Sequence, residues 1–352
     1  MTPPVSDNED AYNKLTAALH PSELGTVLEI AILPSSHPQE ILYDKEHPAL
    51  ALPKSLLVQC YLEARKSLFR YLAAPENTQQ KHHEALHATT VLLLYDPTHN
   101  TAANFRKNHI QVLQAQCAET EHGHRQRERG ARDLEDAVHD DLRFLTALLT
   151  SPLSKHPKSS TLWSHRFWLV RNFPDLCVPC HQESSTSIQE NHLTDAEGAR
   201  TREQMRVGIE MGVERAKKLW NQELEIVMRA GERHPRNYYA WGYARQLLGF
   251  VDGKIAEVGE RGWVEWVGTG MGMGKVHKWC LMHPRDVSGW GFLVFLMQRI
   301  RERGSVDGCE SESGSEIKRV AWETREWVRK YEWRGESVEW FLKAVEQLRL
   351  GR

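Results

Sequence analysis

A proline followed six residues later by a tryptophan recurs three times along this chain. The three pairs are Pro157 with Trp163, Pro235 with Trp241, and Pro284 with Trp290. A fourth stretch, DPTHNTAANFRKNHI, contains Pro97 and has Ala103 at the tryptophan position. Because a spacing that recurs along a chain is the signature of a repeat architecture, these four stretches predict the unit from which the fold is built.

Each stretch is typical of a tight turn between two helices. Proline ends the preceding helix and keeps the residue before it out of the α region. Polar side chains then stand where they can cap the next helix, namely Ser159 with Ser160, Asn237, and Asp286. We expect each tryptophan to lie in the first turns of that helix and to be buried against the neighbouring hairpin.

An arginine and an apolar run follow the tryptophan position. Arg106 and Arg166 stand three residues after this position. In the third unit Ala244 stands there and Arg245 follows one place late, and the last unit has Leu293 there. Apolar residues continue at helical spacing, and similar patterns precede each turn. No segment shows the sustained alternation of apolar and polar residues that is typical of exposed strands. The pattern therefore predicts an all-α chain, a stack of helical hairpins.

The predicted organisation is a single α-solenoid domain over residues 51–350, preceded by an N-terminal extension over residues 1–50. The repeats lie near residues 82–117, 134–172, 202–250 and 273–303, and capping helices occupy residues 315–349. The four prolines are 60, 78 and 49 residues apart, so the array is irregular. The excess length falls in charged, serine-rich or glycine-rich stretches at 118–136, 177–201, 251–275 and 303–316. These compositions predict surface loops or disordered insertions.

The composition argues against several classes of protein. Hydrophobic residues make up 40% and charged residues 26%, which suits a chain that buries a core. The formal net charge of -2 gives no reason to expect a nucleic acid as the main partner. No apolar stretch approaches the ~18–20 residues of a membrane span, and the start of the chain lacks a secretory signal pattern. Six cysteines are scattered without such a signal, so we expect reduced thiols and a cytoplasmic location.

The order Pro-x-Asn-Tyr-x-x-Trp, followed by arginine and an apolar run, resembles the repeat of protein prenyltransferase alpha subunits. The stretch HPRNYYAWGYARQLL is the nearest copy, and HPKSSTLWSHRFWLV keeps a Trp-x-His-Arg core. The resemblance covers roughly Leu86 to Met297. Degenerate repeats and long insertions make the chain most similar to the divergent branch called protein prenyltransferase alpha subunit repeat-containing proteins.

This resemblance implies a right-handed superhelical α-α solenoid that wraps around a beta subunit. The pair would transfer an isoprenoid, expected to be geranylgeranyl rather than farnesyl, from its diphosphate to a C-terminal cysteine of a protein substrate. Zinc, with magnesium as a further ion, is expected in the beta subunit, and no cofactor is expected in this chain. The chain would supply docking, peptide-groove and diphosphate contacts, and it would be inactive alone.

The resemblance also implies site residues. In the family, the second repeat presents a lysine near the departing diphosphate, five residues before its tryptophan, and here that position is Lys158. An ammonium group there would neutralise charge that develops on the leaving group. The tyrosine expected two positions later is Ser160. In the third repeat the matching substrate-binding stretch is Arg236, Asn237, Tyr238 and Tyr239, with Tyr239 where farnesyltransferase-type chains have a histidine.

Two other motifs are weaker. CVPCH places Cys177 and Cys180 at zinc-ligand spacing, with His181 or His192 as a third ligand, but no second cysteine pair follows. We therefore expect a loop with free thiols. GTGMGMGK has Thr269 and Val276 where a phosphate loop needs glycine and Ser/Thr, so we expect a mobile glycine loop instead.

Two alternatives stay open beside the transferase hypothesis. Lys158 also suits a plain solvated turn. Ala103, Ser160 and Leu293 replace the tryptophan, tyrosine and arginine of the family pattern, and these replacements favour a helical-repeat scaffold without transferase function. A tetratricopeptide-type peptide binder is disfavoured, because its repeats have a period near 34 residues.

Overall fold

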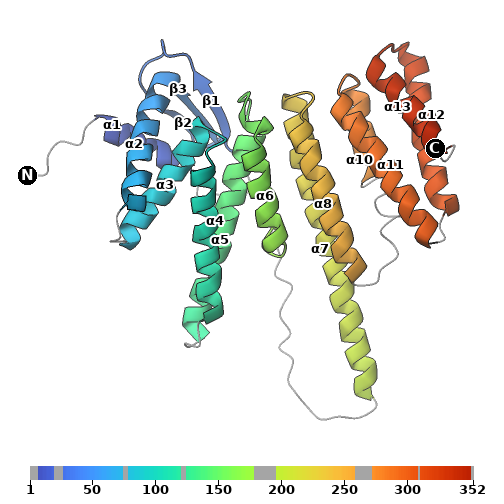
Figure 1. Ribbon diagram of the computed structural model, residues 1–352, viewed down its shortest axis with the longest axis horizontal. Coiled ribbons are helices and arrows are strands. Elements are labelled where there is room, and N and C mark those ends of the chain that lie inside the picture. Colours follow the sequence, from blue (N-terminus) through green and yellow to red (C-terminus); the bar gives the residue numbers. More distant parts are fainter. Residues whose placement is uncertain are drawn as a thin grey trace, which may run out of the picture. The chain divides into compact units, whose positions relative to one another are not determined.

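The computed structural model describes residues 7–19, 27–73, 78–119, 124–177, 196–257, 272–307 and 310–349. The chain divides into two compact units, Met1–Cys177 and Val178–Arg352. In both units most described residues lie in helices that pack as consecutive hairpins (Figure 1). The predicted all-α repeat class is therefore confirmed, with one exception in the first unit.

The first unit contains the first two repeat turns. Its elements are α1 (Asp7–Leu19), β1 (Glu29–Leu33), β2 (Leu42–Asp44), β3 (Ala49–Pro53), α2 (Lys54–Ala73), α3 (Gln79–Tyr95), α4 (Asn100–Glu119), α5 (His124–Leu149), the 3-10 turn η1 (His156–Lys158) and α6 (Ser160–Asn172). Helix α3 packs against α2 and α4, and α5 packs against α4 and α6. The run Val91 to Leu94 is buried at every position. A helix that is apolar all round in this way is enclosed by its neighbours.

The exception is a three-stranded sheet in the order β1-β3-β2. Strand β3 pairs in parallel with β1 and antiparallel with β2. Leu50 and Leu52 are buried, while Ala49 and Ala51, which alternate with them along β3, are partly exposed. The sequence did not predict this sheet, because alanine and leucine are both apolar and the alternation between the two faces is invisible in ALALP.

The second unit contains the third and fourth repeat turns. Its elements are α7 (Ala196–Arg233), α8 (Tyr238–Glu257), α10 (Met273–Met282), α11 (Val287–Asp307), α12 (Glu310–Tyr331) and α13 (Glu336–Arg349). Helix α7 packs against α8, and α11 packs against α10, α12 and α13. The core is aromatic, with fully buried Trp220, Trp241, Trp290, Phe292 and Phe341. Each of these rings buries on the order of 150–250 Å², which explains how short hairpins pack stably.

Two of the four predicted insertions are largely helical, so that prediction was wrong for them. Helix α5 begins at His124, within residues 118–136, and α11 and α12 cover most of residues 303–316. Charged side chains suit the exposed face of a helix as well as a loop, and the side chains of residues 125–129 are exposed. Of the other two insertions, residues 178–195 and 258–271 lie outside the described residues.

Candidate functional site

The turn between α5 and α6 shows why proline and tryptophan keep their spacing. The indole Nε1–H of Trp163 donates a 2.8 Å hydrogen bond to the carbonyl oxygen of Pro157. The hydroxyl of Ser159 accepts from the backbone N–H of Leu162 at 3.2 Å. Trp163 and Ser159 are buried, so each bond satisfies a group whose burial alone would cost about 1–3 kcal/mol. The predicted cap and tryptophan position are both confirmed.

The same turn is bonded to the turn before it. The Ser159 hydroxyl donates to the carbonyl of Pro97 at 2.6 Å. His156 Nε2 lies 2.8 Å from the carbonyl oxygen of Leu94, so this nitrogen carries the proton. Burial lowers the pKa of His156 to about 4, which keeps the ring neutral at pH 7. The second turn is thus joined to the first by His156, which precedes the repeat proline, and by Ser159, which follows it.

The fourth turn repeats the arrangement. Trp290 is fully buried, and its Nε1–H donates to the carbonyl of Pro284 at 3.1 Å. One carboxylate oxygen of Asp286 accepts from the backbone N–H groups of Ser288 at 2.9 Å and Gly289 at 3.0 Å. The same arrangement therefore occurs in both units: an indole bonded to the proline carbonyl, and a polar side chain that caps the helix.

The third turn keeps the position of the tryptophan without the hydrogen bond. Trp241 is fully buried, yet its indole nitrogen has no hydrogen-bond partner among the described residues. The ring packs edge-on against Trp279 at 5.1 Å between centroids and lies 5.1 Å from Phe292. Asn237 caps α8 by accepting from the N–H of Ala240 at 3.2 Å. Packing alone holds the tryptophan in this repeat.

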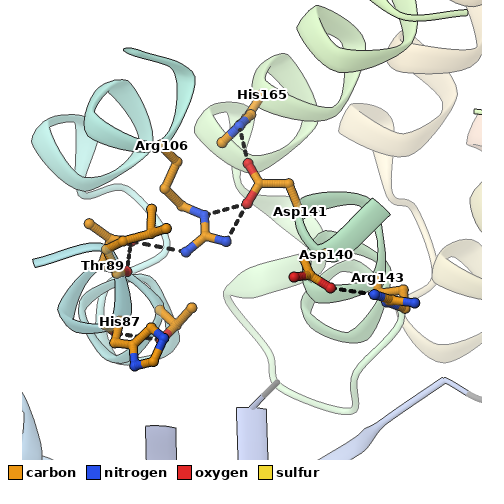
Figure 2. Close-up of polar contacts among 9 residues, drawn as sticks. His87, Thr89, Arg106, Asp140, Asp141, Arg143 and His165 are labelled. Carbon is orange, nitrogen blue, oxygen red and sulfur yellow. Dashed lines mark hydrogen bonds and ion pairs between the residues drawn. The ribbon is translucent and has the colours of Figure 1, made fainter. Parts of the chain in front are cut away.

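The first turn has lost the tryptophan and uses its arginine in a buried ion network (Figure 2). Arg106 on α4 donates through Nε to Asp141 on α5 at 2.6 Å and through Nη1 to Thr89 on α3 at 3.0 Å. His165 on α6 brings Nε2 to within 3.0 Å of the second oxygen of Asp141. Side chains from four helices, α3, α4, α5 and α6, therefore form one network.

The electrostatics of this network are those of a structural clamp. Burial by itself would raise the pKa of Asp141, but the charge of Arg106 and the hydrogen bond from His165 hold it well below its usual range. Burial lowers the pKa of His165, and Asp141 opposes that shift only in part. All three side chains are at most 3% exposed. Because no substrate reaches them, the network fastens helices rather than performing chemistry.

The other repeat arginines also fasten helices. Arg166 donates through Nη1 to the carbonyl of Leu142 at 3.2 Å and to the hydroxyl of Thr146 at 2.9 Å, which ties α6 to α5. The guanidinium of Arg245 lies over the rings of Phe292 and Phe295, 5.8 Å and 5.4 Å from their centroids. Burial lowers the pKa of Arg245. Arg166 therefore joins two helices, and Arg245 packs on aromatic rings of α11.

The predicted ligand residues belong to different units of the chain. Lys158 is exposed at the end of η1 in the first unit. Arg236, Tyr238 and Tyr239 gather at the third turn in the second unit, and the two tyrosines are 64% and 50% exposed. Asn237, predicted with them as a substrate contact, is instead fully buried and bonded to the start of α8. It is therefore a cap, and the side chains around it are the ones that a ligand can reach.

Arg236 has a strained backbone that the sequence did not predict. Its φ angle is 62°, in the left-handed region that arginine rarely adopts. The backbone N–H of Arg236 donates to the carboxylate of Asp286 at 2.7 Å, so the fourth turn holds the third. The role of Asp286 as a cap was predictable from its position, but its bond to the preceding turn was not. The buried role of Asp141 was also not predicted, because an aspartate in a highly charged helical segment is usually expected to be solvated.

Neither of two grooves formed by described residues is lined by a predicted ligand residue. One, of about 620 Å³, lies on the sheet of the first unit. The other, of about 480 Å³, lies between α7 and α10 and is lined by Arg229, Arg233 and Trp279 among others. Within the described part of the chain, no three metal-ligating side chains gather. Cys177 is partly exposed, whereas Cys180, His181 and His192 lie outside the described residues.

Comparison with known proteins finds the same repeat. Residues 140–173 and 220–251 match the protein prenyltransferase alpha subunit repeat. These segments contain the end of α5 with α6 and the end of α7 with α8, which frame the second and third turns. None of the described helices combines the length and apolar character needed to cross a bilayer.

The curated relatives include a repeat-containing protein and a geranylgeranyl transferase subunit. The chain is 26% identical over 213 residues to protein prenyltransferase alpha subunit repeat-containing protein 1 of Danio rerio, covering 60% of this chain and 37% of the relative. It is 24% identical over 206 residues to geranylgeranyl transferase type-2 subunit alpha of Saccharomyces cerevisiae, covering 56% and 45%. The chain thus spans less than half the length of these relatives. Residues 140–173 and 220–251 thus match protein prenyltransferase alpha subunit repeats, and the chain is similar to proteins that contain these repeats.

Proposed function

We propose that this chain is the alpha-type subunit of a heterodimeric protein prenyltransferase that transfers a geranylgeranyl group to a C-terminal cysteine of a protein substrate. The repeats and the similarity to a geranylgeranyl transferase alpha subunit support the proposal. A beta subunit would hold zinc and the isoprenoid diphosphate, with magnesium as a further ion. This chain would supply the docking surface, part of the peptide groove, and cationic contacts to the diphosphate.

The observation that carries the proposal is the third turn. Its buried residue, Asn237, caps a helix, while the guanidinium of Arg236 and the phenols of Tyr238 and Tyr239 are left exposed. A left-handed arginine costs on the order of 1–3 kcal/mol, and such strain is concentrated at functional positions. The hydrogen bond from the backbone N–H of Arg236 to Asp286 stabilises this left-handed conformation. A turn that needed only to connect two helices would place glycine here.

The exposed groups suit an anionic ligand. A guanidinium donates two parallel hydrogen bonds to a diphosphate or a carboxylate, and a phenol adds a neutral donor. In the proposal, Arg236 and Tyr239 orient the isoprenoid diphosphate, and Lys158 neutralises charge on the departing diphosphate. Zinc in the beta subunit would favour the thiolate form of the substrate cysteine, outside this chain. This chain contributes position and charge only.

The experiment is co-expression of the chain with candidate beta subunits, followed by an assay of labelled geranylgeranyl transfer to a peptide that ends in cysteine. We expect a stable complex that transfers lipid, and a Lys158→Ala complex that forms normally but turns over roughly tenfold more slowly. Lys155→Ala is the matched control, because Lys155 is exposed in the same turn. Failure to form a complex with any beta subunit contradicts the proposal.

A helical-repeat scaffold without transferase function is the second candidate. It is favoured by one specific observation: neither groove of about 620 Å³ or 480 Å³ is lined by Lys158, Arg236 or Tyr239. The serine at position 160, where the family has tyrosine, points the same way. A complex that forms with a beta subunit but transfers no lipid under any tested condition selects this candidate.

A further inference from the structure

The sheet of the first unit has one covered face and one open face. Ile30, Leu50 and Leu52 are at most 1% exposed, so one face of β1 and β3 is buried. On the opposite face the register places Ala31, Ala51 and Leu42 in one row across the three strands. Strands β1 and β3 run parallel, and parallel pairs in proteins are ordinarily covered on both faces.

The open face forms the groove of about 620 Å³. Short alanine side chains make its floor, Leu42 is 52% exposed along one strand, and Pro152 adds to the wall. Adjacent strands lie about 4.8 Å apart, so three strands span about 10 Å, which is close to the diameter of one helix. The groove therefore has the width and the apolar floor that fit a helix with large aliphatic side chains.

The charges at the groove have one sign. The charged residues that line it are Glu29, Glu40 and Asp44, and no lysine or arginine lines it. Glu29 and Asp44 share one cross-strand row with Ala49 between them, on the same face as the alanines. Carboxylates in this arrangement complement lysine or arginine side chains that flank an apolar stripe, and they repel an acidic segment.

The internal segments outside the described residues offer no matching charge. The internal segments outside the described residues are 20–26, 74–77, 120–123, 178–195, 258–271 and 308–309. Each has more carboxylates than lysines and arginines, or has none of either. Charge complementarity therefore favours a separate polypeptide.

We propose that this sheet face is a docking site for an amphipathic helix of another polypeptide, with aliphatic side chains against the alanine floor and basic side chains beside Glu40 and Asp44. The site goes beyond the proposed transferase function, because it uses neither the repeat turns nor Lys158 and Arg236. It would give the first unit a partner of its own.

The test uses the full chain and two fluorescein-labelled 18-residue helical peptides. Both carry leucines at positions i, i+3, i+4 and i+7; one is flanked by lysines and the other by glutamates. Anisotropy titrations are expected to show binding of the lysine peptide at least tenfold tighter than that of the glutamate peptide, weakening as salt rises. Leu42→Asp and Glu40→Lys are each expected to weaken binding of the lysine peptide at least fivefold.

The matched controls are Leu62→Asp and Glu84→Lys, both at exposed helix positions that do not line the groove. These are expected to bind like the wild type, and circular dichroism should show all four variants folded. The proposal is overturned if the two peptides bind equally, if neither binds, or if the controls weaken binding as much as the groove variants. If the chain self-associates and Leu42→Asp abolishes this self-association, the proposal is also overturned, because the occupant of the groove would then be a second copy of the chain.

Discussion

The indole of Trp163 donates its hydrogen bond to the carbonyl of Pro157, six residues earlier in the chain. Trp290 and Pro284 form the same bond in the second unit. The spacing recurs because the proline fixes where its own carbonyl lies, and a tryptophan in the first turns of the next helix reaches it. The repeat is thus a bonded turn as well as a pattern of packing.

Replacing Trp290 by phenylalanine is expected to destabilise the second unit more than replacing Trp241. Both rings are fully buried and both changes remove the same volume, but only Trp290 donates to a carbonyl. The difference in unfolding free energy should be about 1 kcal/mol. Urea unfolding followed by circular dichroism measures it, and equal losses for the two variants would show that the bond adds nothing.

Asp141→Asn is expected to cost about 3–5 kcal/mol, because it leaves the buried guanidinium of Arg106 without its counter-ion. The neighbouring Asp140→Asn is the control: Asp140 pairs with Arg143 at a half-exposed position, so its loss should cost less than about 1 kcal/mol. Urea unfolding of both variants measures the contrast. The double variant Arg106→Met with Asp141→Leu should be more stable than Asp141→Asn. Similar losses of unfolding free energy for Asp140→Asn and Asp141→Asn would contradict a structural role for the Arg106–Asp141 network.

The stability of the second unit is expected to fall as the pH is lowered from about 6.5 to 4. Burial lowers the pKa of His277 to about 4, whereas an unfolded histidine titrates near 6.5. The unfolded state therefore binds a proton first, and stability present above pH 6.5 is lost as the pH falls, by about 1–3 kcal/mol. His277→Gln, which can keep a bond to Thr324, should flatten this dependence in thermal melts, and His37→Gln at an exposed position should not.

Arg236→Gly is expected to leave the second unit as stable as the wild type or to stabilise it by up to about 1 kcal/mol. Glycine adopts the φ angle of 62° without strain, and the backbone bond to Asp286 survives the change. Asp286→Ala should instead cost about 1–2 kcal/mol, because α11 loses its cap and the third turn loses its anchor. Calorimetry of the two variants distinguishes them. A loss on Arg236→Gly would mean that the arginine side chain is structural.

The sequence predicted the repeat turns well because their chemistry is local. Ser159, Asn237 and Asp286 are caps as expected, and Trp163, Trp241 and Trp290 are buried at the expected register. Contacts between distant residues were not predictable. The partner of Arg106 is 35 residues away on another helix, and the partner of the Arg236 backbone is 50 residues away. The sheet was not predicted, because every residue of ALALP is apolar and no alternation of apolar and polar residues marks its two faces.

The candidate site was predictable only in part. The resemblance pointed to Arg236, Tyr238 and Tyr239, and the structure leaves all three exposed, but it turns Asn237 into a buried cap. Nothing local in the sequence indicates the left-handed backbone of Arg236, since the residue that favours it would be glycine. Lys158 stays a prediction, because its role depends on groups outside this chain.

The most direct test of the transferase account is single-turnover lipid transfer by the complex of this chain with its beta subunit, comparing wild type with Arg236→Gly and Arg236→Lys. The glycine variant keeps the turn and removes only the side chain. We expect the glycine complex to assemble normally and to transfer lipid at least tenfold more slowly, with the lysine variant in between. Transfer by the glycine complex at the wild-type rate would contradict the assignment of Arg236 to the diphosphate.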